Sequence, residues 1–268
     1  MSSNKQLLNM PELQDSILAT PPEQSVAHAV SRTGSRLVGD LFLAGYITDC
    51  LQMATGLGAI HKLLLVDEGQ KRGAAPATIA RHVAQADDNM RWASEMQAED
   101  YHRVNVLALL SLWAAFEAGT ENIIASALGT VYFAATAAVG KFPIGRYKAG
   151  DWPWTDETCL EIAQKLDQKA KSETPDGGWN VAARLTTLFG WIGASVAISP
   201  ETSKKLNETS MVRNVLLHRY GRLSTRDIQR APHLVVNQNK AVQITRDRLR
   251  EYSQQVGCKR TLADYLFA

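Results

Sequence analysis

Cysteine is scarce in this chain of 268 residues, which contains only Cys50, Cys159 and Cys258. The three lie far apart, and none stands in a CxxC pair. This odd number of separated thiols excludes a cysteine zinc site and a disulfide framework, and is typical of a protein in a reducing cytoplasm. The chain also lacks the basic start and apolar run of a signal peptide. We therefore expect a cytoplasmic protein.

Several motifs of common enzyme classes are absent as well. The sequence has no internal repeat, no Walker A pattern, no G-x-G-x-x-G and no His-x-x-x-His metal spacing. No serine or cysteine stands at a recognisable spacing from a base. We therefore expect no bound cofactor and no metal.

Segments in which apolar and polar residues alternate are rare, whereas long apolar periods of helical spacing are common. The sequence therefore predicts an all-α fold, a helical bundle with one small β-hairpin near the C-terminus. The hairpin is expected at residues 234–244, where two short apolar runs flank Asn237-Gln238-Asn239-Lys240.

Helices are expected over most of the chain after a polar lead-in at residues 1–30. The segments with a helical apolar period are 36–66 with a break near Gly56, 77–100, 103–139, 155–172, 179–197, 200–220 and 245–256. Thr155 and Thr245 are predicted caps, and Ser199-Pro200 is a strong helix start. We divide the chain into an N-terminal helical region, 1–100, which either stands alone or packs into the same domain, and a helical domain, 101–268.

Nineteen residues from Asn122 to Gly140 carry no charge. Their length is marginal for a membrane span, and they are rich in Ala, Gly, Ser and Thr. Because Glu117 and Glu121 stand just upstream, a buried helix is favoured over a membrane helix, and we expect no membrane association.

Charge is distributed unevenly along the chain. Residues 201–268 hold thirteen Lys and Arg against six Asp and Glu, while the first two hundred residues hold sixteen against twenty-one. A basic end indicates a polyanionic partner such as RNA, because phosphate neutralisation dominates nucleic-acid affinity. A solvated helix that happens to be rich in arginine would give the same pattern.

The loop at residues 140–154 combines cations with aromatic residues, among them Arg146, Tyr147, Trp152 and Trp154. Single-stranded nucleic acid stacks on such combinations. The alternative is that the tryptophans simply pack beneath neighbouring helices.

The most informative stretch is residues 211–220, Met-Val-Arg-Asn-Val-Leu-Leu-His-Arg-Tyr, which is predicted to be helical until Gly221. Asn214 and His218 are four apart and share a face. Arg213 and His218 are five apart, so on one ideal helix they point about 140° away from each other. If both act on one phosphate, the helix must end between them or a second chain must complete the site.

The spacing of Arg213, Asn214 and His218 resembles the R-x4-6-H signature of the HEPN superfamily, and His218-Arg219-Tyr220 resembles the H-x-Y extension of HEPN toxins. The resemblance is specific over residues 200–256, extends back to residue 103 and is absent before that. It implies a helical bundle that cleaves RNA without metal at a dimer interface. It also implies a homodimer and an antitoxin of the nucleotidyltransferase type, which would attach a nucleotide to the Tyr220 hydroxyl.

The resemblance and the chemistry together assign roles to four residues. His218 suits general acid–base catalysis, because the pKa of histidine lies near working pH. Arg213 would hold the phosphate oxygens bidentately, and Asn214 would orient the histidine or donate to phosphate. Glu117 resembles the acidic residue that HEPN proteins place opposite this pair, although a glutamate with its carboxylate in solvent is an alternative.

We therefore predict a metal-independent endoribonuclease, either a toxin or an antiviral defence effector. The alternative is a non-catalytic HEPN-like module that binds RNA, a nucleotide or a protein partner. A plain helical interaction protein is a third interpretation, since the first hundred residues match no known pattern.

Overall fold

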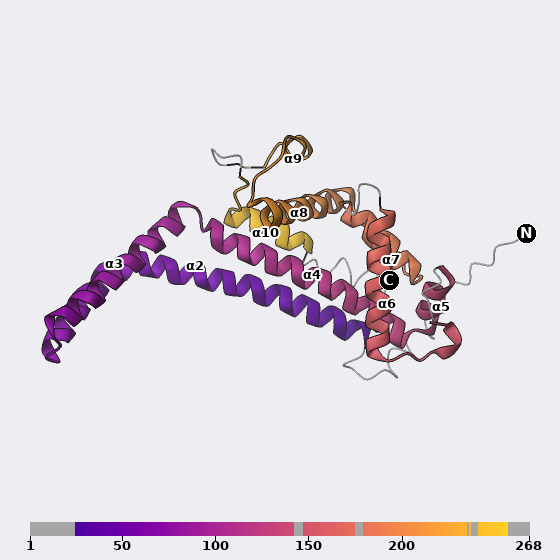
Figure 1. The fold of residues 1–268 in the computed structure, drawn as a ribbon, viewed down its shortest axis with the longest axis horizontal. Coiled ribbons are helices and arrows are strands. Elements are labelled where there is room, and N and C mark those ends of the chain that lie inside the picture. The colour runs from indigo at the N-terminus through magenta and orange to yellow at the C-terminus, as the bar shows by residue number, and fades with distance from the viewer. Residues whose placement is uncertain (1–24, 142–146, 175–178, 235, 237–240, 257–268) are drawn as a thin grey trace, which may run out of the picture. The chain divides into compact units, whose positions relative to one another are not determined.

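The computed structural model describes residues 25–141, 147–174, 179–234, 236 and 241–256, and the chain there is almost entirely helical (Figure 1). The elements in order are α2 (Val26–Lys71), α3 (Pro76–Ala98), α4 (His102–Thr130), α5 (Tyr132–Lys141), a 3-10 turn η1 (Ala149–Asp151), α6 (Asp156–Glu173), α7 (Val181–Trp191), α8 (Pro200–Arg219), α9 (Thr225–Arg230) and α10 (Arg246–Val256). The predicted all-α class is confirmed.

The chain forms two compact units, and each is assembled from segments distant in sequence. The first unit comprises residues 1–38, 112–214 and 252–268, and the second comprises 39–111 and 215–251. The unit boundaries therefore fall inside α2, α4, α8 and α10. The division of the chain predicted near residue 100 stays a prediction.

The core of the first unit is built on the second part of α4. Its large side chains are fully buried, as are those of α6 and α7, and Figure 1 shows where these three helices lie in the chain. The fully buried side chains include Leu112, Trp113, Ile123, Ile124, Leu128, Ile162, Leu166, Leu188 and Phe189. The helix expected to be hydrophobic on most sides thus lies at the centre of its unit.

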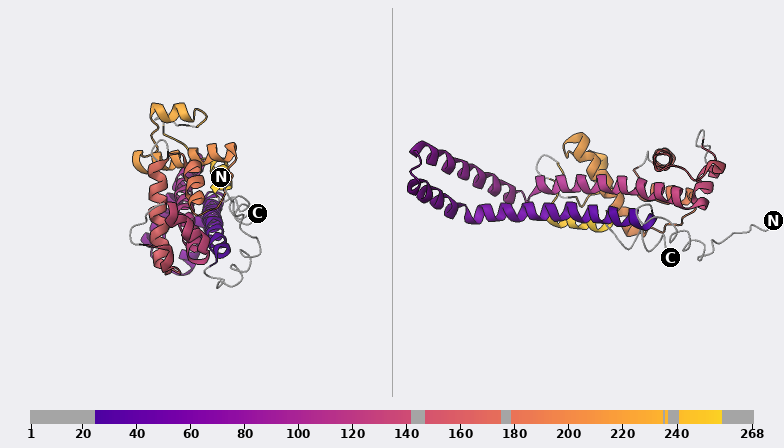
Figure 2. Two further views of the ribbon diagram at one scale, coloured as in Figure 1. Left: turned by 90° about the vertical axis from the view of Figure 1, so that its right-hand side faces the viewer. Right: turned by 90° about the horizontal axis from the view of Figure 1, so that it is seen from below.

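In the second unit, α3 runs back along the later part of α2 (Figure 2). Leu51 packs in one cluster with Ala93, Met96 and Tyr101. Lys62 of α2 forms an ion pair with Asp87 of α3, with Nζ 2.6 Å from Oδ1.

The helix break predicted near Gly56 is wrong, because α2 continues through all of its glycines to Lys71. Two of the glycines allow close packing of α2 on α3. A Cβ at Gly58 would overlap Met90, and a Cβ at Gly69 would meet Ile79. This packing offsets the cost of about 1 kcal/mol that each glycine imposes on a helix.

The predicted helix caps are confirmed. The Thr155 side chain accepts from the N–H of Thr158 at the start of α6, and Pro200 is the first residue of α8. Thr245 accepts from the N–H of Arg248 at the start of α10. Such caps are encoded locally, since one oxygen satisfies one unpaired N–H of the first turn.

Two predicted helices are shorter than expected. The stretch 103–139 divides into α4 and α5, whose axes are bent by 109° at Val131. Helix α7 ends at Trp191, because Gly193 adopts a φ of +80° and Ala194 donates its N–H to the carbonyl of Phe189 at 3.0 Å. This left-handed glycine ending is a frequent helix terminator.

No single helix in the described part of the chain is long and apolar enough to cross a membrane. The bent pair α4 and α5 together reaches the required length and apolar character.

The predicted hairpin at 234–244 is not confirmed. Among the described residues, the β-pairing in this region consists of two isolated antiparallel bridges, Val236 with Val242 and Arg222 with Ala241. Val235 and the turn, residues 237–240, lie outside the described residues.

Candidate functional site on helix α8

Arg213, on the part of α8 that belongs to the first unit, is held by an ion pair and a hydrogen bond. Its Nη2 lies 3.4 Å from Oε2 of Glu117 on α4, and its Nη1 donates to Oδ1 of Asn214 at 2.8 Å. The side chains of Arg213 and Glu117 are both 28% exposed. The structure thus brings together three of the four proposed catalytic residues, although Glu117 is 96 positions away from Arg213 in sequence.

A second arginine extends this cluster into the interior of the unit. Nη1 of Arg184 on α7 lies 3.8 Å from Oε1 of Glu117, and its Nε lies 3.5 Å from Oδ1 of Asp167 on α6. Lys171 completes the set, with Nζ 2.7 Å from Oδ2 of Asp167. We call these five residues, Glu117, Asp167, Lys171, Arg184 and Arg213, the ion-pair network.

Arg184 and Asp167, both of which are buried, were not predicted from the sequence as members of a site. A signal was present, because Arg184 is the one charged residue in the apolar sequence of α7. A buried charge must be paired, so a lone arginine on such a helix predicts an acidic partner on a neighbouring one. The sequence alone does not indicate which acidic residue that is.

The ion-pair network has a net charge of plus one, since three cations surround two carboxylates. Glu117 lies between two guanidinium groups, and its removal would leave both without their shared carboxylate. Breaking a buried pair in this way costs about 3–5 kcal/mol when both partners are fully buried, and less where one side reaches solvent, as Arg213 does. A phosphate could reach Arg213 by taking the place of Glu117, because a guanidinium binds either anion through the same paired N–H groups.

His218 lies in the second unit, on the exposed last turn of α8. Among the described residues, His218 forms no hydrogen bond or ion pair with a member of the ion-pair network. Its imidazole is therefore open to solvent.

The end of α8 has an unusual backbone. Tyr220 adopts a φ of +52° and Gly221 a φ of +81°, and the N–H of Gly221 donates to the carbonyl of Val215 at 3.0 Å. The left-handed conformation is natural for glycine and costs roughly 1–2 kcal/mol for tyrosine. The Tyr220 side chain is 93% exposed, so its hydroxyl is accessible.

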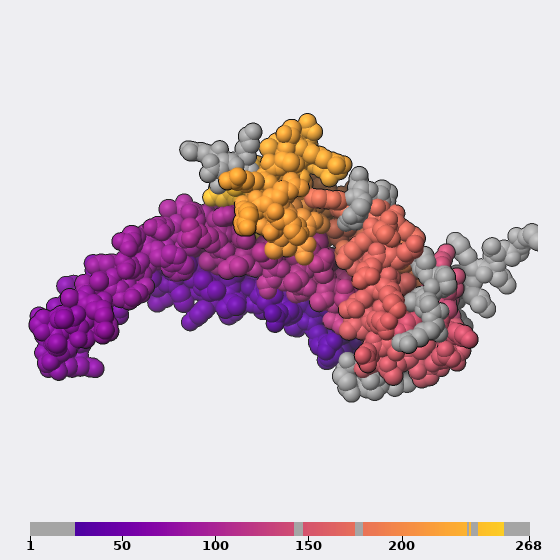
Figure 3. All heavy atoms as spheres, viewed as in Figure 1, coloured from indigo at the N-terminus to yellow at the C-terminus, as the bar shows by residue number. Residues whose placement is uncertain are grey.

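Arg219 connects the end of α8 to α9 through an ion pair with Asp227. Helix α9 lies at the surface (Figure 3). Nη1 of Arg219 lies 2.7 Å from Oδ2 of Asp227, and Asp227 forms a capping box with Ser224. Burial acts to raise the pKa of Asp227, but the hydrogen bonds from Ser224 and the nearby Arg219 outweigh it and hold that pKa below its ordinary value. Arg219 is thereby engaged within its own unit.

The aromatic residues described in the 140–154 loop pack against helices. Trp152 donates its Nε1–H to the carbonyl of Leu128 at 2.9 Å, and Trp154 is 91% buried. The Tyr147 hydroxyl is 2.5 Å from Oε2 of Glu161. The interpretation in which the tryptophans pack beneath helices therefore agrees with the structure, while Arg146 lies outside the described residues.

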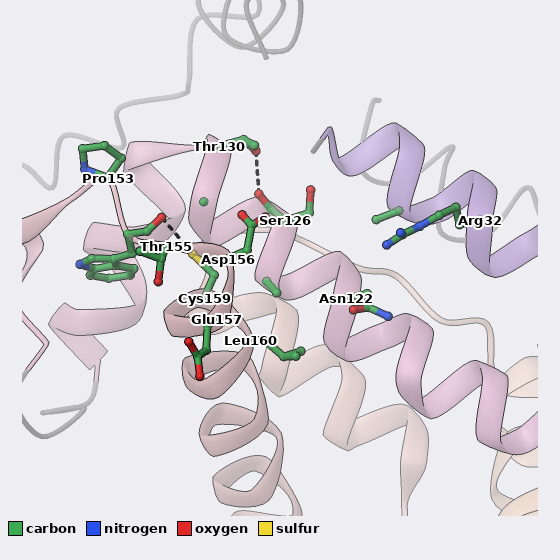
Figure 4. A pocket seen from close by; sticks show the side chains of 14 residues that line it. Arg32, Asn122, Ser126, Thr130, Pro153, Thr155, Asp156, Glu157, Cys159 and Leu160 are labelled. Carbon is green, nitrogen blue, oxygen red and sulfur yellow. Dashed lines mark hydrogen bonds between the residues drawn. The ribbon is translucent and has the colours of Figure 1, made fainter. Parts of the chain in front are cut away.

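A pocket of about 740 Å³ opens in the first unit at the start of α6 (Figure 4). Arg32 of α2 and Asn122 of α4 contribute to its lining, as do Asp156 and Glu157. Two carboxylates in the first turn of α6 disfavour a phosphate here. Burial, and secondly the charge of Asp156, raise the pKa of the lining Cys159 to about 11, so this thiol stays protonated and is a poor nucleophile.

Within the described residues, no three histidine, cysteine or carboxylate side chains lie close enough together to hold a metal ion. Comparison of the chain with protein-family models, curated proteins and solved structures finds no match.

Proposed function

We propose that this chain is a metal-independent endoribonuclease of the HEPN type, acting as a toxin or an antiviral defence effector. The observation that supports the proposal best is the placement of Arg213 and Asn214 beside Glu117. An arginine, an amide and an acidic residue converge there, upstream of an exposed histidine on the same helix. This is the residue set that the R-x4-6-H resemblance implies.

In the proposed reaction, the ribose 2′-oxygen attacks the adjacent phosphorus and the 5′-oxygen leaves. Either His218 takes the proton from the 2′-hydroxyl while water protonates the leaving 5′-oxygen, or water takes that proton while His218 protonates the 5′-oxygen. Arg213 exchanges Glu117 for the phosphate oxygens and stabilises the charge of the pentavalent state. The products are a 2′,3′-cyclic phosphate and a 5′-hydroxyl, and no electron transfer or metal-bound water is needed.

The proposed enzyme is a homodimer in which the α8 helices of two chains meet. On one ideal helix Arg213 and His218 diverge by about 140°, so the arginine of one copy and the histidine of the other would serve one phosphate. A two-fold axis places a patch against its own copy and would build two equivalent sites.

A non-catalytic module that binds RNA, a nucleotide or a protein partner is the second candidate. One observation favours it: the Arg213 guanidinium is already bound by Glu117 and Asn214 and is largely buried. In that case Arg213 stabilises the unit, and the basic C-terminal region binds polyanions without cutting them.

The experiment that separates these functions is cleavage of a fluorescent RNA by His218→Ala and by the wild type. We expect a loss of about 100- to 10,000-fold in rate, the usual contribution of general acid–base catalysis. Since His218 is exposed, the thermal midpoint should stay unchanged. Cleavage by the wild type should persist in EDTA.

His82→Ala is the matched control, since His82 is an exposed histidine on α3. Arg213→Lys keeps the charge but loses the bidentate fork, so it should cleave more slowly while remaining folded. A stable His218→Ala variant that cuts at the wild-type rate would contradict the proposed enzyme. A wild type that binds RNA without cutting it would support the binding module.

A further inference from the structure

Helix α2 has two apolar faces, whereas a helix at the surface of a soluble protein has one. Its inner face packs within the second unit, where Ala44, Thr48, Leu51 and Gly58 are buried. Spacings of four, three and seven residues keep these positions on one side of the helix. This face contacts α3, as the packing at Gly58 shows.

A second set of positions lies on the opposite side of α2 and is open to solvent. We call it the outer stripe, and its members are Phe42, Tyr46, Cys50, Met53, Leu57, Ile60 and Leu64. The members are separated by three or four residues, the pattern of a heptad seam. At 100° per residue the outer stripe is roughly 200° from the inner face.

The outer stripe is exposed to an extent that is unusual for side chains of this size. Phe42 is 77% exposed, Tyr46 63%, Met53 61%, Ile60 55% and Leu64 55%. None of the seven members is charged, and the exposed Asp49 lies beside them between Tyr46 and Met53. Leu43 and Leu63 widen the apolar surface and are also exposed. Contiguous apolar surface of this kind marks a site of association.

The order of residues along the outer stripe indicates what covers it. Around Met53, four members are arranged symmetrically, with Tyr46 and Ile60 seven residues away and Phe42 and Leu64 eleven away, while the counterparts of Leu57 and Cys50 are Asp49 and Gly56. In an antiparallel pair of α2 helices, Phe42 would face Leu64 of the other copy and Tyr46 would face Ile60. A two-fold interface places each position of a patch against its counterpart in this way, and the apolar pairs that result at both ends and at the centre favour a second copy as the partner.

The available area fits a stable dimer. The outer stripe extends over about 33 Å of helix at 1.5 Å per residue. With the exposures given above, the outer stripe and its two flanking leucines offer on the order of 800 Å² per copy, the share that one partner contributes to a standard interface. We propose that the outer stripe of α2 is a homodimer interface in which two α2 helices pack antiparallel about Met53.

This inference does not depend on the proposed ribonuclease activity, and its test measures only assembly. Light scattering of the full chain at micromolar concentration should show self-association, and because an α8 dimer would also raise the mass, the effect of a substitution in α2 decides which interface forms. Ile60→Glu places a charge in the apolar seam and should raise the dissociation constant about tenfold or more. Ala59→Glu, an exposed position beside it but off the outer stripe, is the matched control and should leave the dimer intact. Circular dichroism should show equal helicity in both variants.

Cysteine cross-linking tests the direction of packing in a Cys50→Ser, Cys258→Ser background, where the remaining native thiol, Cys159, is buried and has a raised pKa. With a short bismaleimide, Met53→Cys should cross-link to its own copy. Phe42→Cys and Leu64→Cys should each fail alone but cross-link when mixed. If each of the three cross-links to itself, the packing is parallel and the proposal is wrong.

Two further outcomes would also overturn the proposal. A wild type that stays monomeric, with no cross-link from any of the three cysteines, would mean that something other than a second copy covers the outer stripe. Binding of that monomer to phospholipid vesicles, lost in Ile60→Glu and kept in Ala59→Glu, would identify a membrane surface instead.

Discussion

At the scale of single residues, Tyr220 is unusual because its backbone conformation favours glycine although its side chain is large. The left-handed φ of +52° favours glycine, yet a large aromatic side chain is placed there and is 93% exposed. A strained conformation at an exposed residue motivates a functional hypothesis, because packing gives no reason to keep it. The proposed attachment of a nucleotide to the Tyr220 hydroxyl is such a function.

We predict that Tyr220→Gly raises the thermal midpoint by a few degrees, since it removes roughly 1–2 kcal/mol of backbone strain. Tyr220→Phe retains the strain and should melt like the wild type. Co-expression with a neighbouring nucleotidyltransferase should add a nucleotide mass to the wild type, seen by intact mass spectrometry, and to neither variant. Wild-type chains of unmodified mass would count against modification at this residue.

Only some residues of the candidate site could be predicted from the sequence. The expectation that Glu117 faces Arg213 depended on the family resemblance, and the two side chains do form an ion pair. Arg184 and Asp167 were not expected, because the pairing of buried charges depends on which helices pack together. The role of His218 in catalysis stays a prediction.

At the scale of helices and turns, the features that the sequence predicted well are those decided by neighbouring residues. The start of α6 at Thr155 and the end of α8 at Gly221 follow from side-chain capping and from glycine φ. The features it missed depend on distant contacts. Helix α2 continues through Gly58 because Met90 of α3 occupies the space that a side chain would need.

The first turn of α4 also makes a contact that the sequence did not predict. His102 accepts the N–H of Ile244 at its Nδ1, at 3.0 Å, and Asn105 donates to the carbonyl of the same residue at 3.0 Å. Two side chains thereby satisfy both backbone groups of Ile244. Burial lowers the pKa of His102, although the charge of Glu99 acts in the opposite direction.

This contact predicts a loss of stability in mild acid. Because the folded-state pKa of His102 lies below 6.5, its contribution to stability is complete above pH 6.5. As the pH falls from 6.5 toward the lowered pKa, the unfolded chain binds the proton first and that contribution is lost. His102→Gln should flatten this part of the profile of thermal midpoint against pH. His82→Gln, which removes an exposed histidine, is the control, and equal slopes in all three proteins would contradict the prediction.

At the scale of the whole molecule, neither unit is continuous in sequence. The second unit joins α2, α3 and the start of α4 to residues 215–251. Contacts such as those of His102 and Asn105 with Ile244 link positions about 140 residues apart. Such long-range contacts favour slow folding, because the chain must close large loops before they form.

A fragment of residues 101–268 tests whether the predicted domain stands alone. It would retain Tyr101 and Val104 but lose Leu51, Ala93 and Met96, with which they pack. We expect the fragment to bind a hydrophobic dye and to melt without a sharp transition, while the full chain melts cooperatively. A fragment with the cooperativity and helical signal of a native domain would show that residues 1–100 are dispensable for folding.

The glycines of α2 have a consequence for how this sequence can diverge over evolution. Gly58 and Gly69 lie against Met90 and Ile79, whereas a Cβ at Gly39, Gly45 or Gly56 would meet nothing within 4 Å. Descendants of this gene should therefore exchange the second group freely for alanine, which favours helix by about 1 kcal/mol. They should keep Gly58 and Gly69, or replace them only together with a smaller residue at the facing position of α3. Correlated change between Gly58 and Met90, or between Gly69 and Ile79, in an alignment of related sequences would mark the packing of α2 on α3.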